Sequence, residues 1–215
     1  MNKVLLTGFD PFGGETINPA WEVVSQLSHR PFEGLEVEVR QIPTVFTKSI
    51  QKLRQAILEV KPDVVICVGQ AGGRSDIAIE RVAINVNDAR IPDNEGNQPI
   101  DEPIAAAGPV AYWSSLPIKA ITSQLRKAGI PASVSHTAGT FVCNHLFYGL
   151  QHMLATEFPA IRGGFIHIPY LPIQTEQKPQ MPSMSLEVMV KAIEIAVVTS
   201  VQHKQDIFAS EGQLH

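Results

Sequence analysis

The sequence predicts a single α/β domain built around a mostly parallel β-sheet. Short runs rich in β-branched residues alternate with amphipathic helical patterns along the chain, which is typical of βαβ units. The run Asp63–Gly69 is continuously apolar, as expected for a central strand that helices cover on both faces. The 215 residues, 44% of them hydrophobic, can form one large core, and no linker divides them. We therefore expect one domain over residues 1–215.

The alternation of the two patterns gives the predicted elements in order. Strands are expected at Lys3–Thr7, Leu35–Ile42, Asp63–Gly69, Ala132–His136 and Gly164–Ile168. Helices are expected at Asn18–Ser28, Thr44–Val60, Pro117–Gly129, a stretch that carries Cys143, and Met184–Gln202. Proline is acceptable in a first helical turn and glycine often ends a helix, which supports Pro117 and Gly129 as the limits of the third helix. Ser183 is the candidate N-cap of the last helix.

Two segments depart from this alternation. The run Ile77–Val86 reads as one added strand of either direction. The proline-rich segment Asn87–Tyr112 is too long for a simple connector, and its Ile-Pro and Gly-Pro turns indicate an ordered lobe. A second proline-rich loop runs through Pro182. After Gln202 the chain is polar, and about residues 203–215 are predicted to form a disordered tail.

Composition excludes several classes of partner and cofactor. The formal net charge is −4, and lysine and arginine are scattered, so neither nucleic acid nor an anionic membrane is an expected partner. No apolar run reaches the roughly 18 residues of a membrane span, and the first residues turn polar too early for a signal peptide, so we expect a cytoplasmic protein. Cys67 and Cys143 lack a CxxC spacing, which predicts free thiols and no metal site. The glycine-rich stretches match no nucleotide-binding motif.

The stretch GTFVCNHLFYGL raises the question of whether Cys143 is a core thiol or a nucleophile. Free cysteines are usually buried, and we interpret Cys67, inside an apolar strand, as such a residue. Cys143 instead follows a strand and precedes a helical pattern, which places it near a helix N-terminus at the carboxyl edge of the sheet. The helix dipole there is expected to lower the thiol pKa, and free N–H groups can receive an oxyanion.

A cysteine nucleophile needs a base, and the sequence offers seven histidines. His145 and His152 are expected to point away from Cys143 on a helix. Three others lie at a helix end or near the C-terminus: His29, His203 and His215. The candidates that remain are His136 and His167, both near the carboxyl ends of predicted strands. The stiffening Pro169 favours His167.

Strand alternation suggests a carboxylate partner for the base. Within Ile77–Val86, Glu80 is the only charged residue on an otherwise apolar face. A buried carboxylate requires a partner. One interpretation pairs Glu80 with a structural arginine, Arg74 or Arg90; the other has Glu80 accept the histidine N–H, as in a catalytic triad.

Four stretches together resemble one family: TGFDPFGGETINPAWE, GQAGGRSDIAIERVAINVNDARIPDN, GTFVCNHLFYGL and GFIHIPYLP. In this order, and over nearly the whole chain, they are similar to the pyrrolidone carboxyl peptidases, or pyroglutamyl peptidases I. The resemblance implies a three-layer α/β/α sandwich around a mixed, mostly parallel sheet. It also implies a cysteine peptidase without a cofactor, commonly a homotetramer, that removes N-terminal pyroglutamate from peptides through a thioacyl-enzyme. It assigns the nucleophile to Cys143, the base to His167 and the orienting acid to Glu80.

The resemblance also implies a pocket for the pyroglutamyl ring. Arg90, with the backbone N–H of Cys143, corresponds to the oxyanion site. Asn18 and Gln70 correspond to the polar contacts to the lactam. The apolar walls correspond to Phe9, Phe12, Ile91, Phe141 and Val142. Each of these residues has a structural alternative, because apolar side chains usually form the core and Asn18 before Pro19 is a good helix cap.

Two other functions compete with the peptidase interpretation. A glutamine amidase also uses cysteine, histidine and glutamate, but it flanks its cysteine with glycines, whereas Val142 and Asn144 adjoin Cys143. A non-catalytic small-molecule binding protein on the same scaffold would hold Cys143 as a packed thiol. Reactivity toward iodoacetamide separates the second alternative from an enzyme.

Overall fold

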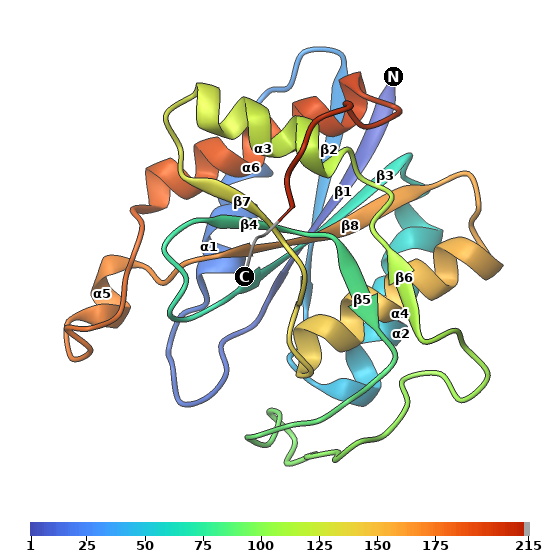
Figure 1. Ribbon diagram of the computed structural model, residues 1–215, viewed down its shortest axis with the longest axis vertical. Helices are drawn as coiled ribbons and strands as arrows, with labels where there is room; N and C mark the ends of the chain where they lie inside the picture. The colour runs from blue at the N-terminus through green and yellow to red at the C-terminus, as the bar shows by residue number, and fades with distance from the viewer. Residues whose placement is uncertain (213–215) are drawn as a thin grey trace.

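The computed structural model describes residues 1–212, which form a six-stranded sheet between two layers of helices (Figure 1). The strand order is β2-β1-β3-β8-β4-β7. Their bounds are β1 (Asn2–Phe9), β2 (Leu35–Ile42), β3 (Val64–Gln70), β4 (Ile77–Glu80), β7 (Ala132–Ser135) and β8 (Arg162–Ile168). β2, β1, β3 and β8 are parallel, while β4 pairs antiparallel to β8 and parallel to β7. The mixed, mostly parallel sheet is confirmed.

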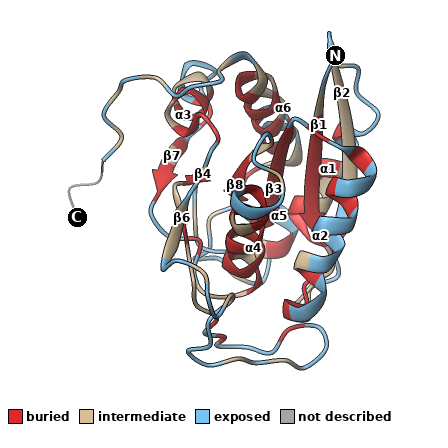
Figure 2. Cartoon of the chain, turned by 90° about the vertical axis from the view of Figure 1, so that its right-hand side faces the viewer, coloured by how far each residue is buried: buried red, intermediate tan, exposed pale blue. Residues whose placement is uncertain are grey.

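Helices cover both faces of the sheet and bury its strands (Figure 2). One face packs against α1 (Pro19–Leu27), α3 (Ile118–Lys127) and α6 (Leu186–Gln202). The other packs against α2 (Phe46–Val60) and α4 (Val142–Thr156). All seven residues of β3 are buried, which agrees with its continuous apolar sequence. The predicted α/β/α sandwich is therefore confirmed.

Local signals account for some of the helix ends. The Asn18 side chain accepts a hydrogen bond from the Ala20 N–H and caps α1, with Pro19 in the first turn. Gly129, with φ of +76°, follows α3 as expected. The N-cap of α6 is Ser185 and not Ser183, because the Ser185 hydroxyl accepts from the Val188 N–H. The short helix α5 (Pro172–Thr175) lies in the loop after β8.

The prediction of one strand over Ile77–Val86 is wrong, because the chain leaves the main sheet at Arg81. β4 ends at Glu80, and β5 (Val82–Ile84) pairs with β6 (Ala111–Trp113) in a separate two-stranded antiparallel sheet. The Arg81 N–H donates to the Ser135 carbonyl, while the Arg81 carbonyl accepts from Ser114. The apolar alternation continues across this bend and therefore gives no sign of it.

The segment between β5 and β6 is ordered, as the proline turns indicated. The Asn85 side chain accepts from the N–H groups of Ile104 and Ala105 at 2.8 and 2.9 Å. The Asp93 carboxylate accepts from the Phe46 N–H at 2.9 Å and so caps α2, whose own N-cap residue, Val45, makes no side-chain cap. Hydrogen bonds therefore tie this lobe to the rest of the domain.

Residues 203–212, which were expected to be disordered, make contacts with the rest of the domain. Asp206 accepts from the backbone N–H groups of Lys119 and Ala120, with its Oδ1 at 3.1 and 2.9 Å from the two nitrogens. It thereby caps α3, whose N-cap residue, Pro117, has no capping side chain. Glu211 forms an ion pair with Arg126 at 2.9 Å. The final part of the predicted tail, residues 213–215, lies outside the described residues.

Candidate active site

Cys143 is the second residue of α4, directly after the loop that follows β7. The predicted position at a helix N-terminus is therefore confirmed. Phe141 is the extended N-cap residue, and the N–H of His145 bonds to its carbonyl. The Cys143 N–H belongs to the first helical turn, and within residues 1–212 no acceptor binds it. It is free to donate to an incoming oxygen atom.

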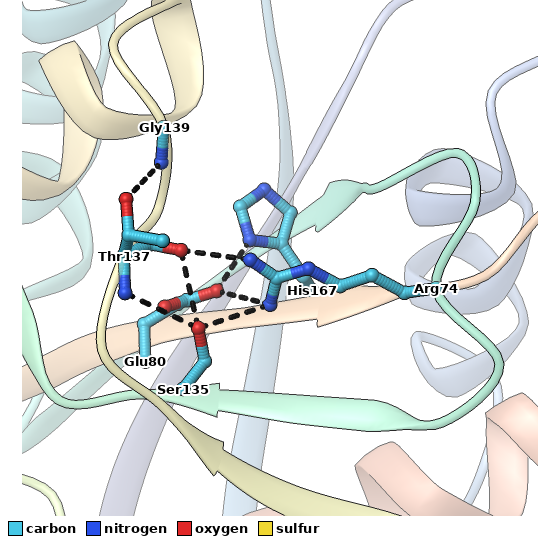
Figure 3. Close-up of polar contacts among 6 residues, drawn as sticks. All are labelled: Arg74, Glu80, Ser135, Thr137, Gly139 and His167. Carbon is cyan, nitrogen blue, oxygen red and sulfur yellow. Dashed lines mark hydrogen bonds and ion pairs between the residues drawn. The ribbon is translucent and has the colours of Figure 1, made fainter. Parts of the chain in front are cut away.

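His167 lies near the end of β8 and faces Glu80 (Figure 3). Its Nδ1 is 2.7 Å from the Oε1 of Glu80, and both side chains are buried. Ala78 pairs with His167 across the antiparallel strands, so Glu80, two residues along β4, points to the same face of the sheet. Of the two candidate bases, His136 is exposed. The structure thus brings His167, and not His136, to the carboxylate.

The surroundings of Gly69 show where the thiol lies relative to the histidine. Gly69 is the sheet partner of His167, and a Cβ atom on Gly69 would lie 3.1 Å from the Cys143 Sγ. The thiol therefore lies directly above the strand that neighbours His167. Within the described residues no hydrogen bond joins Sγ to the imidazole. Catalytic hydrogen bonds of this kind often tighten only in the complex with substrate.

Glu80 also forms the ion pair with arginine that sequence analysis left as its alternative. The Arg74 Nη1 lies 2.8 Å from Glu80 Oε1, the same oxygen that binds His167. Arg74 additionally donates to the Ser135 hydroxyl at 3.0 Å and to the Thr137 carbonyl at 2.7 Å. Glu80 therefore contacts an arginine and a histidine at the same time. Ser135 and Thr137 were not predicted as site residues, although their place between a predicted strand end and the nucleophile was a usable signal.

The pKa of Cys143 differs from the expectation. Burial, and secondly the negative charge of Glu80, raise this pKa to about 12, although the charge of Arg74 opposes the rise. The helix N-terminus was expected to lower the pKa of Cys143, whereas desolvation of the thiolate acts in the opposite direction. Burial also raises the pKa of Cys67 to about 12, and Cys67 is fully buried, as predicted. A thiol whose pKa is raised in this way needs a base to take its proton.

Aromatic rings cluster at the start of α4, around its N-cap residue Phe141. The ring of Phe141 lies 6.0 Å from that of Phe12 and 5.3 Å from that of Phe46. Ile91 is 43% exposed, and its Cδ1 lies 4.0 Å from where a Cβ on Gly13 would be, next to Phe12. Phe46 was not identified from the sequence, because it begins α2 and resembles an ordinary core residue.

Two of the predicted wall residues belong to the core. Phe9 is buried, with its ring 6.3 Å from that of Phe165, and Val142 is fully buried at the start of α4. Both pack in the same cluster under α2 and α4. Both side chains are therefore packed inside the protein.

The predicted polar contacts are partly engaged within the protein. The Asn18 amide caps α1 and donates to the Asp10 carbonyl at 2.9 Å. The Gln70 Oε1 accepts from the Gln174 Nε2 at 2.9 Å, while in residues 1–212 no acceptor binds the Gln70 Nε2. Arg90 is exposed and, in the same part of the chain, forms neither a hydrogen bond nor an ion pair.

His145 and His152 point away from Cys143, as predicted. His145 Nδ1 lies 3.0 Å from the Asn87 Oδ1, and burial lowers its pKa to about 4. His152 Nδ1 lies 2.9 Å from the Tyr112 hydroxyl. Both rings are therefore occupied in holding the β5–β6 lobe against α4.

Over the described range, no three histidine, cysteine or acidic side chains gather in a way that could hold a metal ion. In the same residues, every helix is too short or too polar to cross a membrane.

Comparison with known proteins gives one consistent result. A family model described as pyroglutamyl peptidase matches residues 2–203. The chain is 62% identical to the pyrrolidone-carboxylate peptidase of Brevibacillus brevis over 214 residues, covering 100% of both sequences. It is 59% identical to the protein of that name from Bacillus velezensis, covering 99% of each.

Solved structures agree. The crystal structure of pyroglutamyl peptidase I from Bacillus amyloliquefaciens superposes with a TM-score of 0.95 at 59% identity, covering 97% of this chain and 99% of that one. The pyrrolidone carboxyl peptidase from Thermococcus litoralis superposes with a TM-score of 0.94 at 41% identity, covering 98% and 100%.

Proposed function

Because this chain belongs to the pyroglutamyl peptidase family of cysteine peptidases, we propose that Cys143, His167 and Glu80 form the triad with which it removes N-terminal pyroglutamate. The observation that carries the assignment is the 2.7 Å contact between His167 Nδ1 and Glu80 Oε1, next to a thiol at the start of α4. The carboxylate fixes the ring with its proton on Nδ1, which leaves Nε2 as the base.

The raised pKa of Cys143 determines how the first step proceeds. His167 Nε2 takes the thiol proton as Sγ attacks the carbonyl carbon of the pyroglutamyl residue. The tetrahedral intermediate breaks its C–N bond, and the imidazolium gives its proton to the leaving amine. Water, activated by the same imidazole, then attacks the thioacyl-enzyme and releases pyroglutamate and the free thiol. Glu80 stabilises the imidazolium in both steps.

The negative oxygen of the intermediate needs donors that are already in place. The unbound N–H of Cys143 is one, and the helix dipole of α4 adds to it. Arg90 is the proposed second donor. Its exposed guanidinium makes no competing contact within residues 1–212, and it adjoins Ile91 at the aromatic cluster.

The ring pocket suits a neutral, compact substrate. Phe12, Phe141 and Ile91 are proposed to contact the ring, with Phe9 and Val142 forming the floor beneath them. Gln70 is proposed to donate its Nε2 to the lactam carbonyl, because Gln174 already holds its Oε1. The proposed contact of Asn18 with the lactam N–H uses the second lone pair of its carbonyl oxygen.

Turnover of a pyroglutamyl amide, with Cys143→Ala as the inactive control, tests the proposed function. A prolyl amide is the discriminating comparison, since proline has the same ring shape but lacks the carbonyl and carries a charged amine. A site that hydrogen-bonds a substrate group rejects analogues without it by about 10⁴ or more, so we expect at least that ratio in kcat/KM. Similar turnover of the two amides would contradict the lactam contacts of Asn18 and Gln70.

A cytoplasmic homotetramer is proposed on the family resemblance alone. Sedimentation velocity of the purified protein tests the assembly, and fractionation of cells that produce it tests the location. A monomer at micromolar concentration, or recovery outside the cytoplasm, would contradict these two proposals.

A further inference from the structure

Arg74 contacts two parts of the site: Glu80, six residues later in the sequence, and the end of β7, 61 to 63 residues later (Figure 3). It lies in the loop between β3 and β4, and its side chain is 29% exposed. Nη1 contacts the Glu80 carboxylate and the Ser135 hydroxyl, and Nη2 contacts the Thr137 carbonyl. One planar guanidinium therefore contacts the acid of the triad and the end of β7 at the same time.

We propose that Arg74 is a positioning residue of the active site, which keeps Glu80 available to His167 and fixes the loop that leads to Cys143. This inference rests on the proposed function for the catalytic roles of Glu80, His167 and Cys143. It assigns to Arg74 more than a structural ion pair.

The burial of Glu80 explains why its carboxylate needs Arg74. Its carboxylate is fully buried, and among the described residues Oε2 has no hydrogen-bond partner. A buried carboxylate that lacks a cation is strongly disfavoured. The guanidinium, which stays charged, supplies that cation, so the imidazole of His167 need not be charged to compensate it. His167 is then left to act as the base.

The other end of the guanidinium fixes the loop that leads to Cys143. Thr137 receives the Arg74 bond on its carbonyl, and its hydroxyl accepts from the Gly139 N–H at 3.1 Å. The Ser135 hydroxyl also donates to the Thr137 carbonyl at 3.1 Å. These contacts fix the turn between β7 and α4, only a few residues before Cys143. Arg74 therefore links the position of the acid to that of the nucleophile.

The charge of Arg74 also acts on the thiol. Glu80 and Cys67 raise the pKa of Cys143, and Arg74 lowers it. The other titratable group of the site is His167 on β8, beside Gly69, and Arg90 lies on the lobe that packs against α4. Removal of the Arg74 charge alone leaves the effect of Glu80 on the thiol unopposed. Cys143 should then need a higher pH to be alkylated at the same rate.

Two substitutions separate charge from geometry. Arg74→Lys keeps a positive charge but cannot make the planar three-point contact. Arg74→Met keeps much of the side-chain volume and loses both. A matched control is Arg54→Met, which breaks the surface ion pair of Arg54 with Glu157 (2.7 Å) far along α2.

Three measurements are needed: steady-state kinetics, thermal unfolding, and the pH dependence of Cys143 alkylation by iodoacetamide. We expect kcat to fall by about 100-fold in both Arg74 variants with little change in KM, because a small displacement of reacting groups has that effect. The alkylation curve should move to higher pH in Arg74→Met and stay near that of the wild type in Arg74→Lys. Arg54→Met should leave kcat and the curve unchanged.

A merely structural Arg74 gives a different result. Both variants would unfold at lower temperature, yet the folded protein would keep the wild-type kcat and alkylation curve, and the inference would be overturned. If Arg74→Met does not fold, Arg74→Lys decides alone, since wild-type kcat in that variant contradicts the positioning role. Alkylation needs no substrate. A wild-type protein that is inactive on pyroglutamyl amides would therefore refute the proposed function, while a shifted curve in Arg74→Met would still support the link between Arg74 and the thiol.

Discussion

The Nδ1 of His167 and the Oε1 of Glu80 are 2.7 Å apart, although the two residues are 87 positions apart in the sequence. The contact follows the antiparallel pairing of β4 with β8, in which Ala78 lies opposite His167 and Glu80 therefore faces the same side of the sheet. A carboxylate that accepts from Nδ1 leaves Nε2 as the reactive nitrogen of the ring.

Loss of a triad member should remove activity without unfolding the protein. We expect Cys143→Ser and His167→Ala each to abolish turnover of a pyroglutamyl amide, because the triad acts as a unit. Glu80→Gln should be milder, with a loss of about 10–1000-fold, since the amide oxygen can still accept the imidazole N–H. Kinetics and thermal unfolding of each variant test this. Unchanged catalysis in Glu80→Gln with a much lower Tm would mean that Glu80 is only structural.

Gly69→Ala should impair catalysis because the added methyl group clashes with its neighbours, and not because of backbone strain. The added Cβ would lie 2.7 Å from the Phe165 ring and 3.1 Å from the Cys143 Sγ, so the thiol or the ring must move. Overpacking of this kind costs about 1–3 kcal/mol of stability, and a displaced thiol lowers kcat by about 100-fold. Gly212→Ala, which has no atom within 4 Å of its added Cβ, is the control. Wild-type kcat in Gly69→Ala would show that the thiol has spare room.

The two thiols should differ in access more than in acidity. Both pKa values are raised to about 12, but Cys67 is fully buried and Cys143 is half-buried. Brief alkylation of the native protein should label Cys143 alone, and 2-pyrrolidone should protect it. Because the thiolate is the reactive form, the rate should rise about tenfold per pH unit between about pH 6 and pH 8. Peptide mapping measures the labelling, and equal label on Cys67 would contradict its burial.

His145 should make the protein sensitive to acid. Its folded pKa is about 4 because the ring is buried, whereas an unfolded histidine titrates near 6.5. As the pH falls through this window the unfolded chain binds a proton that the folded chain does not, so stability decreases, by about 3 kcal/mol in all. His145→Gln, which keeps a group able to bond Asn87, should lose less stability between about pH 7 and pH 4.5 in urea unfolding. Parallel losses in both proteins would assign the acid sensitivity elsewhere.

Asp206 should contribute measurably to stability. Its carboxylate accepts from two N–H groups at the start of α3, and loss of a helix cap typically costs about 1 kcal/mol. Asp206→Ala should therefore lower the urea midpoint, whereas Asp206→Asn should retain most of the effect. A variant cut after Gln202 should lose at least as much as Asp206→Ala. Equal stability of all these proteins would support the original expectation of a disordered tail.

Periodicity was sufficient to predict the sheet, its two helical layers and the position of Cys143, because these depend on local apolar patterns. Alternation also pointed to Glu80, but for a strand that in fact ends at that residue. The bend at Arg81 depends on hydrogen bonds to Ser135 and Ser114, which are distant in sequence and leave no local trace. The pKa of Cys143 likewise depends on what surrounds the thiol in three dimensions.

The caps of α2 and α3 affect the order in which the chain can fold during synthesis. During synthesis the N–H of Phe46 lacks its acceptor until Asp93 is added, 47 residues later. The N–H of Ala120 lacks its acceptor until Asp206 is added, 86 residues later. At about 5–20 residues per second, a ribosome adds the second of these intervals over several seconds. Over that time the N–H groups in the first turn of α3 lack the Asp206 carboxylate as acceptor, and the cap forms only after Asp206 has been added. A chain interrupted between Asp93 and Asp206 would therefore include the capping side chain of α2 and lack that of α3.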